Sequence, residues 1–269
     1  MQVYRGFDIG TDKPTPAQRL AVPHHLLDLV EPSTQFTAAD FAREALAAVR
    51  LIEARQRIPF VVGGTGLYLR ALLEGLFPGP GRDASLRARL EEVARVEGVE
   101  RLHERLEAVD PAYARLIGRR DKTRIIRALE VFGLTQKPLT QHFLKTASPL
   151  AGFHLLKIGL KLEREELYRR IDERVEGMFR RGLVKETENL LRQGTPEDCP
   201  PFRALGYKQA LLFIRKEITL EEAVERTKLD TRHYAKRQMT WFRKTAGVHW
   251  FFGSDSAAVS AAVEALLKA

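Results

Sequence analysis

The spacing of three apolar runs most constrains what this chain can fold into. Residues 58–62 (IPFVV), 153–160 (FHLLKIGL) and 248–252 (VHWFF) are bounded by glycine or proline, as buried strands of a parallel sheet often are. About 90 residues of helical pattern separate each run from the next, whereas one strand–helix–strand crossover needs only about 30. We therefore predict an α/β core, covered on both faces, into which helical material has been inserted.

The helical pattern between these runs contains clear start signals. Thr37 and Thr219 precede apolar residues at helical spacing, so both are predicted as N-caps, and Asp110-Pro111 opens a further helix. Helices are expected over 36–55, 86–106, 123–132, 165–191 (or a pair broken at Gly182), 220–242 and 257–267.

The first fifteen residues, MQVYRGFDIGTDKPT, have the character of a loop that leaves a strand, because they are polar and punctuated by glycine. A parallel sheet needs more strands than the three runs above provide. We therefore expect the first βαβ unit to lie upstream of Met1, the alternative being a small sheet of three strands. The α/β core is then expected over 1–83 and 151–269, with the helical insertion over 84–150, although 175–235 is also helical and could supply part of it.

Composition narrows the kind of partner. The chain carries 44 Lys and Arg against 35 Asp and Glu, and a net charge of +9 favours a polyanion because each neutralised phosphate releases counterions. A well-solvated basic enzyme is equally compatible with this charge. The single cysteine, Cys199, is typical of a reducing cytoplasm, and no apolar run is long enough to predict a membrane span. The seven histidines show no ligand spacing, so no protein metal site is predicted.

Two motifs have the composition of phosphate-binding segments. The turn Gly63-Gly64-Thr65-Gly66 follows an apolar run and opens a helix, which would let backbone N–H groups approach a phosphate or a base. It lacks Walker A spacing, so a tight turn without a ligand is an equal alternative. Arg124 and Arg127 share a helix face and suit an RNA backbone or a diphosphate, unless they form a solvated surface pair.

Two further basic segments contain aromatic residues. In RALGYK (203–208) a tyrosine between cations could stack a base, although Tyr207 could instead pack inward at a helix start. In KRQMTWFRK (236–244) we expect Met239 and Phe242 to pack inward while the cations face solvent. A cationic helix end also favours its own dipole, but the density of Arg, Lys, Gln and Trp makes RNA contact the preferred interpretation.

Taken in order, six blocks resemble the tRNA dimethylallyltransferase (isopentenyl-tRNA transferase) family. They read MQVYRGFDIGTDKP, VPHHLLD, FVVGGTGLYLRALLEGL, TRIIRALEV, RALGYKQ and AKRQMTWFR, and they span the chain from Met1 to about Phe252. The resemblance implies a core related to P-loop nucleotide kinases. It also implies transfer of a dimethylallyl group from dimethylallyl diphosphate to N6 of the adenosine immediately 3′ of the anticodon, usually with Mg²⁺. The adenine must leave its stack to be reached, and a general base takes a proton from the amine.

The resemblance places the catalytic groups outside this chain. In the family a P-loop holds the diphosphate, and a D-S dipeptide directly before the block that begins here at Met1-Gln2 supplies the general-base Asp. No catalytic residue is therefore assigned, and the chain is expected to be poorly active or inactive. The alternatives are an inactive tRNA-binding remnant and a relative of P-loop small-molecule kinases, although no Walker lysine is present.

The resemblance assigns the acceptor side residue by residue. Met1 and Gln2 end the adenine-recognition tetrapeptide, where Gln2 could pair with the adenine edge; Thr65 lies near the substrate adenosine. Thr123 replaces the glutamine of a segment that usually reads Q-R-x-x-R. A cytoplasmic monomer that binds the tRNA anticodon stem-loop is expected. The predicted tRNA-contacting residues are Met1, Gln2, Thr65, Arg87, Thr123, Arg124, Ile125, Ile126, Arg127, Arg203, Ala204, Leu205, Gly206, Tyr207, Lys208, Lys236, Arg237, Gln238, Met239, Thr240, Trp241, Phe242 and Arg243.

Overall fold

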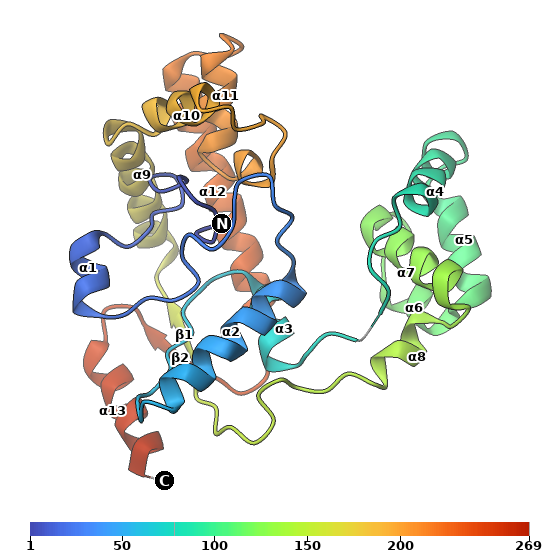
Figure 1. The fold of residues 1–269 in the computed structure, drawn as a ribbon, viewed down its shortest axis with the longest axis horizontal. Helices are drawn as coiled ribbons and strands as arrows, with labels where there is room; N and C mark the ends of the chain where they lie inside the picture. Colours follow the sequence, from blue (N-terminus) through green and yellow to red (C-terminus); the bar gives the residue numbers. More distant parts are fainter. Residues whose placement is uncertain (78, 269) are drawn as a thin grey trace. The chain divides into compact units, whose positions relative to one another are not determined.

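The computed structural model describes residues 1–77 and 79–268, which form two compact units (Figure 1). Unit 1 comprises Met1–Leu69 and Gly152–Ala269, and unit 2 comprises Arg70–Ala151. Among the described helices, none combines the length and the apolarity needed to cross a bilayer.

Unit 1 contains a parallel sheet of two strands, β1 (Lys157–Lys161) and β2 (Val248–Phe252), with Gly159 opposite Trp250. A Cβ on Gly159 would lie 2.7 Å from the Trp250 ring, so the glycine makes room for this indole. A parallel sheet among helices confirms the predicted α/β class. The strand predicted over 248–252 is confirmed, and the one predicted over 153–160 is displaced to 157–161.

The strand predicted over 58–62 is wrong. These residues have no regular secondary structure, and Phe60 and Val62 are 67% and 92% exposed. An extended segment becomes a strand only when a neighbour satisfies its N–H and C=O groups, and no strand pairs with this one in the described part of the chain. The strands that do form are only partly covered, because Leu160 and Phe252 are 59% and 45% exposed.

Local start and stop signals determine the helices of unit 1. Thr37 accepts a hydrogen bond from the backbone N–H of Asp40, and Thr219 caps its helix in the same way, which confirms both predicted N-caps. Gly182, with φ of 97°, separates two helices, so the predicted pair is confirmed. The helices are α1 (Pro16–Ala21), α2 (Ala38–Glu53), α3 (Gly66–Leu73, which continues into unit 2), α9 (Arg164–Arg180), α10 (Leu183–Arg192), η1 (Pro200–Arg203), α11 (Tyr207–Ile214), α12 (Leu220–Phe242) and α13 (Ser256–Lys268).

The N-terminal segment forms part of the main core of unit 1. Phe7 is fully buried, and its ring meets the rings of Phe202 and Tyr207 edge-on at 5.0 and 4.8 Å. Leu183 and Leu190 of α10 line the same cluster. The polar, glycine-rich loop around Phe7 is therefore held against α10 and α11.

Unit 2 is helical, with α4 (Ala84–Val96), α5 (Val99–Val109), α6 (Pro111–Leu116), α7 (Lys122–Thr135) and α8 (Leu139–Phe143). The single helix predicted over 86–106 is wrong, because Gly98 adopts φ of 91° and starts a new helix. Asp110 caps α6 as predicted. Its carboxylate also accepts hydrogen bonds from the N–H and hydroxyl of Thr140, which ties α6 to α8.

Candidate nucleic-acid interface

The glycine-rich turn 63–66 packs against α12, from which it is distant in sequence. Gln238 Nε2 donates to the Gly64 carbonyl at 3.0 Å, and a Cβ on Gly64 would lie 2.0 Å from that same nitrogen. A Cβ on Gly66 would lie 2.4 Å from the Trp241 indole. These two glycines are thus required by the close approach of a helix, while Thr65 between them remains exposed.

The C-terminal half of α12 contacts this turn through Gln238 and Trp241, and it also carries a row of cations. Met239 and Phe242 are partly buried, as predicted from helical spacing. The exposed side chains are Lys236, Arg237, Thr240 and Arg243, followed by Lys244. Two segments singled out separately in the sequence, the glycine turn and the basic helix, therefore pack against each other. Arg237 lies over the ring of Tyr234, whose hydroxyl donates to the Gly64 carbonyl.

Gln2 is oriented by the loop that follows it. Its Nε2 donates to the carbonyls of Thr11 and Asp12, both at 3.0 Å. Since both partners can only accept, the orientation of the amide is fixed and both of its N–H donors are used. Gln2 Oε1 makes no hydrogen bond to any residue that the structure describes, so Gln2 can offer a ligand an acceptor but not a donor.

Lys13 stabilises the same loop from inside. Its side chain is 2% exposed, and Nζ contacts the Tyr4 carbonyl at 2.7 Å and carboxylates of Asp8 and Asp28 at 2.7 and 2.5 Å. Burial alone would raise the pKa of Asp28, but the bonds and charges of Lys13 and Arg19 hold that pKa below its ordinary value. Sequence analysis missed Lys13, because a lysine between aspartate and proline has the pattern of a solvated loop residue.

Tyr207 is fully buried and does not present its ring for base stacking. Its hydroxyl donates to the Glu186 carboxylate and accepts from the N–H of Gly10 at 3.1 Å. The inward-packed alternative is therefore the one observed, and Arg203 and Lys208 are the exposed cations of this segment. Burial, reinforced by the neighbouring Glu186, raises the pKa of the Tyr207 hydroxyl.

In unit 2 the two arginines of α7 have different environments. Arg124 is 58% exposed and pairs with Asp121 at 2.7 Å. Arg127 is engaged by three acceptors: the carbonyls of Pro80 and Gly81 and the Glu130 carboxylate, the last at 2.8 Å. Arg124 thus has the more accessible guanidinium, whereas Arg127 holds the segment at Pro80 and Gly81 against α7.

Glu130, which sequence analysis did not single out, is contacted by Arg87, Arg127 and the backbone of Asp83; we call these residues the Glu130 cluster. Its side chain is fully buried, accepts from the backbone N–H of Asp83 at 3.0 Å and lies 3.9 Å from Arg87. Ile125 and Ile126 pack in the same unit's core at 0% and 2% exposure, so their side chains cannot contact RNA. Thr123 is exposed at the start of α7.

Residues 2–245 match the sequence model of the IPP transferase family. The chain belongs to this family. The tRNA dimethylallyltransferase 2 of Geotalea uraniireducens is 51% identical over 250 residues, which cover 93% of this chain and 81% of that protein. The tRNA dimethylallyltransferase of Geobacter sulfurreducens is 48% identical over the same length, with 93% and 80% covered.

Solved structures of the IPP transferase family share the fold. The full-length tRNA isopentenylpyrophosphate transferase of Bacillus halodurans superposes with a TM-score of 0.70 at 39% identity, covering 99% of this chain and 86% of that one. A eukaryotic dimethylallyltransferase acting on tRNA gives a TM-score of 0.77 at 27% identity, covering 98% and 69%. The resemblance inferred from the six sequence blocks is therefore confirmed.

The Mg²⁺ implied by the family finds no protein cage in the described residues. No group of three or more His, Cys, Asp or Glu side chains is placed there to hold a metal ion. Mg²⁺ that acts on a diphosphate is commonly held by one or two carboxylates together with phosphate oxygens, so such a cage is not required.

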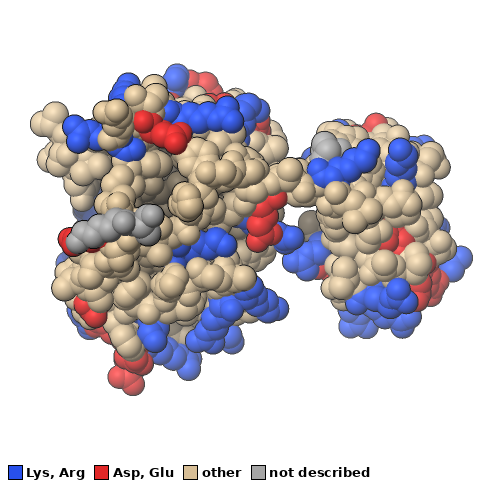
Figure 2. All heavy atoms as spheres, turned by 90° about the horizontal axis from the view of Figure 1, so that it is seen from below, with Lys and Arg blue, Asp and Glu red and all other residues tan. Residues whose placement is uncertain are grey.

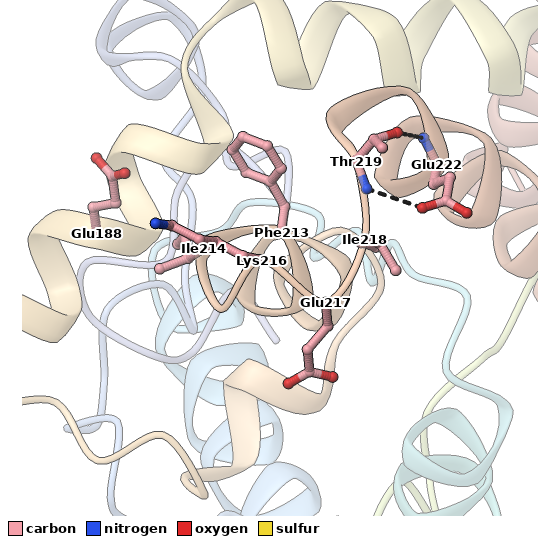
Figure 3. Close-up of a pocket in the computed structure, with 8 residues that line it drawn as sticks. All are labelled: Glu188, Phe213, Ile214, Lys216, Glu217, Ile218, Thr219 and Glu222. Carbon is pink, nitrogen blue, oxygen red and sulfur yellow. Dashed lines mark hydrogen bonds between the residues drawn. The ribbon is translucent and has the colours of Figure 1, made fainter.

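A surface pocket of about 550 Å³ between α10, α11 and the start of α12 does not have the chemistry expected for an RNA or diphosphate site (Figure 3). Its charged lining consists of Glu188, Glu217 and Glu222 against Lys216. Thr219 and Glu222 satisfy each other's backbone N–H groups, as the dashed lines show. A polyanion would be repelled from this pocket, and none of the predicted tRNA-contacting residues lines it.

Proposed function

We propose that this member of the IPP transferase family is a tRNA prenyltransferase. It would move a dimethylallyl group from dimethylallyl diphosphate to N6 of the adenosine immediately 3′ of the anticodon. Alongside the family match, the observation that carries the proposal is the packing of the glycine turn against α12, which leaves Thr65 and the cations of that helix exposed. Exposed cations on the helix that holds this turn are suited to the phosphates of an RNA loop.

The reaction defines what the described residues would do. The N6 lone pair attacks the allylic carbon, the C–O bond breaks, diphosphate leaves with that electron pair, and the amine loses a proton. Gln2 Oε1 would accept a hydrogen bond from the N6–H group and so orient the amine. A neutral amide oxygen is too weak a base to remove the proton, so Gln2 is assigned to recognition of the adenine and not to general-base catalysis.

Both units would contribute to binding the anticodon stem-loop. In unit 1 the exposed cations are Arg203, Lys208, Lys236, Arg237 and Arg243. In unit 2, where residues 84–150 were predicted to contact tRNA, Arg124 is the most accessible of the predicted arginines. We further propose a cytoplasmic monomer, in keeping with one cysteine and a net charge of +9.

The proposal is tested by binding and by transfer. The chain should bind an anticodon stem-loop bearing the target adenine more tightly than a hairpin of equal length with an unrelated loop. Transfer with dimethylallyl diphosphate and Mg²⁺ would be detected as dimethylallyladenosine by mass spectrometry of the digested RNA, with chelator as the metal control. Equal affinity for the two hairpins together with no transfer would contradict the proposed function.

A further inference from the structure

Three consecutive backbone N–H groups in the N-terminal loop are bound by side chains from α10 and α11. The N–H groups of Asp8 and Ile9 donate to the Glu186 carboxylate, the latter at 3.0 Å. The N–H of Gly10 donates to the Tyr207 hydroxyl at 3.1 Å, and that hydroxyl donates in turn to Glu186. One carboxylate and one phenol thus bind the loop at every residue from 8 to 10.

The loop has little room to adopt another position. A Cβ on Gly10 would lie 2.5 Å from the Tyr207 ring, so the backbone is in close contact with that ring. On the preceding side, the fully buried Phe7 meets the same ring at 4.8 Å. On the following side, Asp12 pairs with Arg181 at 3.2 Å and Arg174 at 3.3 Å.

The loop in turn positions Gln2. The two carbonyls that accept from the Gln2 amide belong to Thr11 and Asp12, the residues directly after the bound N–H groups. A shift of residues 8–10 would therefore move both acceptors and rotate the Gln2 amide. Its free oxygen would no longer be aligned to accept from a ligand.

We propose that Glu186 and Tyr207 are positioning residues for recognition of the acceptor base. Neither contacts the RNA. Together they hold the loop that leaves Gln2 Oε1 as a lone acceptor, which selects a base bearing an exocyclic amine. This inference rests on the proposed function, because it assigns the selectivity of that same site.

The test compares two stem-loops that differ in one group, with adenine or unsubstituted purine, which lacks the 6-amino group, at the target position. Wild-type protein should prefer adenine by about two- to tenfold in Kd, the effect of one hydrogen bond.

Tyr207→Phe keeps the ring and removes the hydroxyl, and Glu186→Gln keeps the shape and removes the charge. Each should bring the ratio of the two Kd values close to one. The affinity for the purine stem-loop should stay within about twofold, because the exposed cations are untouched. Glu188→Gln, an exposed position on the same helix, should keep the wild-type ratio.

Each other outcome overturns a separate claim. Wild-type protein that fails to bind either stem-loop above the unrelated hairpin, and that shows no transfer, contradicts the proposed function. A folded Tyr207→Phe or Glu186→Gln protein that keeps the full adenine preference contradicts the positioning role alone. Equal loss of affinity for both stem-loops shows that Glu186 and Tyr207 only stabilise the fold.

A 2-aminopurine placed 3′ of the target adenine gives a second readout, because its fluorescence rises when its neighbour leaves the stack. That rise should be reduced in both variants and retained in Glu188→Gln.

Discussion

Glu186 is a half-buried carboxylate whose pKa is raised, mainly by burial and further by Asp8, against the opposing hydrogen bonds of Tyr207 and the backbone. The folded state therefore favours its protonated form. The stabilisation that this provides is complete below the ordinary pKa of 4.5 and is lost as pH rises through the raised value. We predict that the free energy of unfolding of wild type minus that of Glu186→Gln falls as pH rises above 4.5. Urea unfolding at several pH values measures this difference. A difference that grows with pH would show that the ionised carboxylate is the favoured form.

Glu130 gives a second prediction at the scale of a single residue. It is fully buried and bound by Arg127 and the backbone N–H of Asp83. Glu130→Ala removes the carboxylate that pairs with a partly buried guanidinium and leaves the Asp83 N–H without its acceptor, so it should lower the free energy of unfolding by about 3 kcal/mol. The control is Glu92→Ala, which removes an exposed pair with Arg95 and should cost less than about 0.5 kcal/mol. Comparable costs in denaturant unfolding would mean that the Glu130 cluster does not stabilise unit 2.

At the scale of the secondary-structure elements, the contact between α12 and the glycine turn is sensitive to added volume. Gly66→Ala would bring a Cβ to 2.4 Å from the Trp241 indole, whereas a Cβ on Gly63 meets nothing within 4 Å. We predict that Gly66→Ala destabilises the protein by about 1–3 kcal/mol through overpacking, while Gly63→Ala is close to neutral. Thermal unfolding followed by tryptophan emission measures both. Equal melting temperatures for the two variants would show that the turn moves away from α12 without cost.

The helix starts were predicted correctly because neighbouring residues fix them, whereas of the three predicted strands only that over 248–252 kept its bounds. Thr37 and Thr219 cap their helices because a threonine reaches a backbone N–H three residues on, whatever surrounds it. The segment 58–62 has the composition of a strand, yet strand formation depends on a partner that local sequence does not specify. The break at Gly98 was missed because glycine is tolerated within a helix as well as between two.

In the candidate site, too, features set within one helix were predicted and contacts between distant segments were not. Spacing along α12 predicted which side chains face inward, since one helix supplies all of them. The burial of Tyr207 and its bonds to Gly10 and Glu186 join segments far apart in the chain. No local pattern encodes such contacts, so Glu186 was not identified, and Tyr207 was predicted to contact tRNA with inward packing as the alternative.

At the scale of the whole molecule, the charge of +9 is distributed over both units (Figure 2). On the face shown, basic side chains are prominent on each of them. Many cations of the molecule are already paired with carboxylates, as Arg169 is with Glu166 and Glu173. Net charge alone therefore does not identify which cations bind RNA, and the salt dependence of binding by chosen variants is needed to do so.

Arg124 in unit 2 and Arg237 in unit 1 provide that test, because both are exposed and lie in segments assigned to tRNA contact. Arg124→Ala and Arg237→Ala should each reduce the slope of log K against log salt for the stem-loop by about one, the effect of one phosphate contact. If one RNA contacts both units, the slope of the double variant should be reduced by about two, since distant sites act additively.

Two variants serve as controls. Arg226→Ala removes an exposed cation of α12 that is paired with Glu222, and it should leave the slope unchanged. Arg127→Ala should lower the melting temperature and change the salt slope little, because its guanidinium is engaged by Pro80, Gly81 and Glu130. A double variant with the slope of either single variant would mean that only one unit binds the RNA backbone.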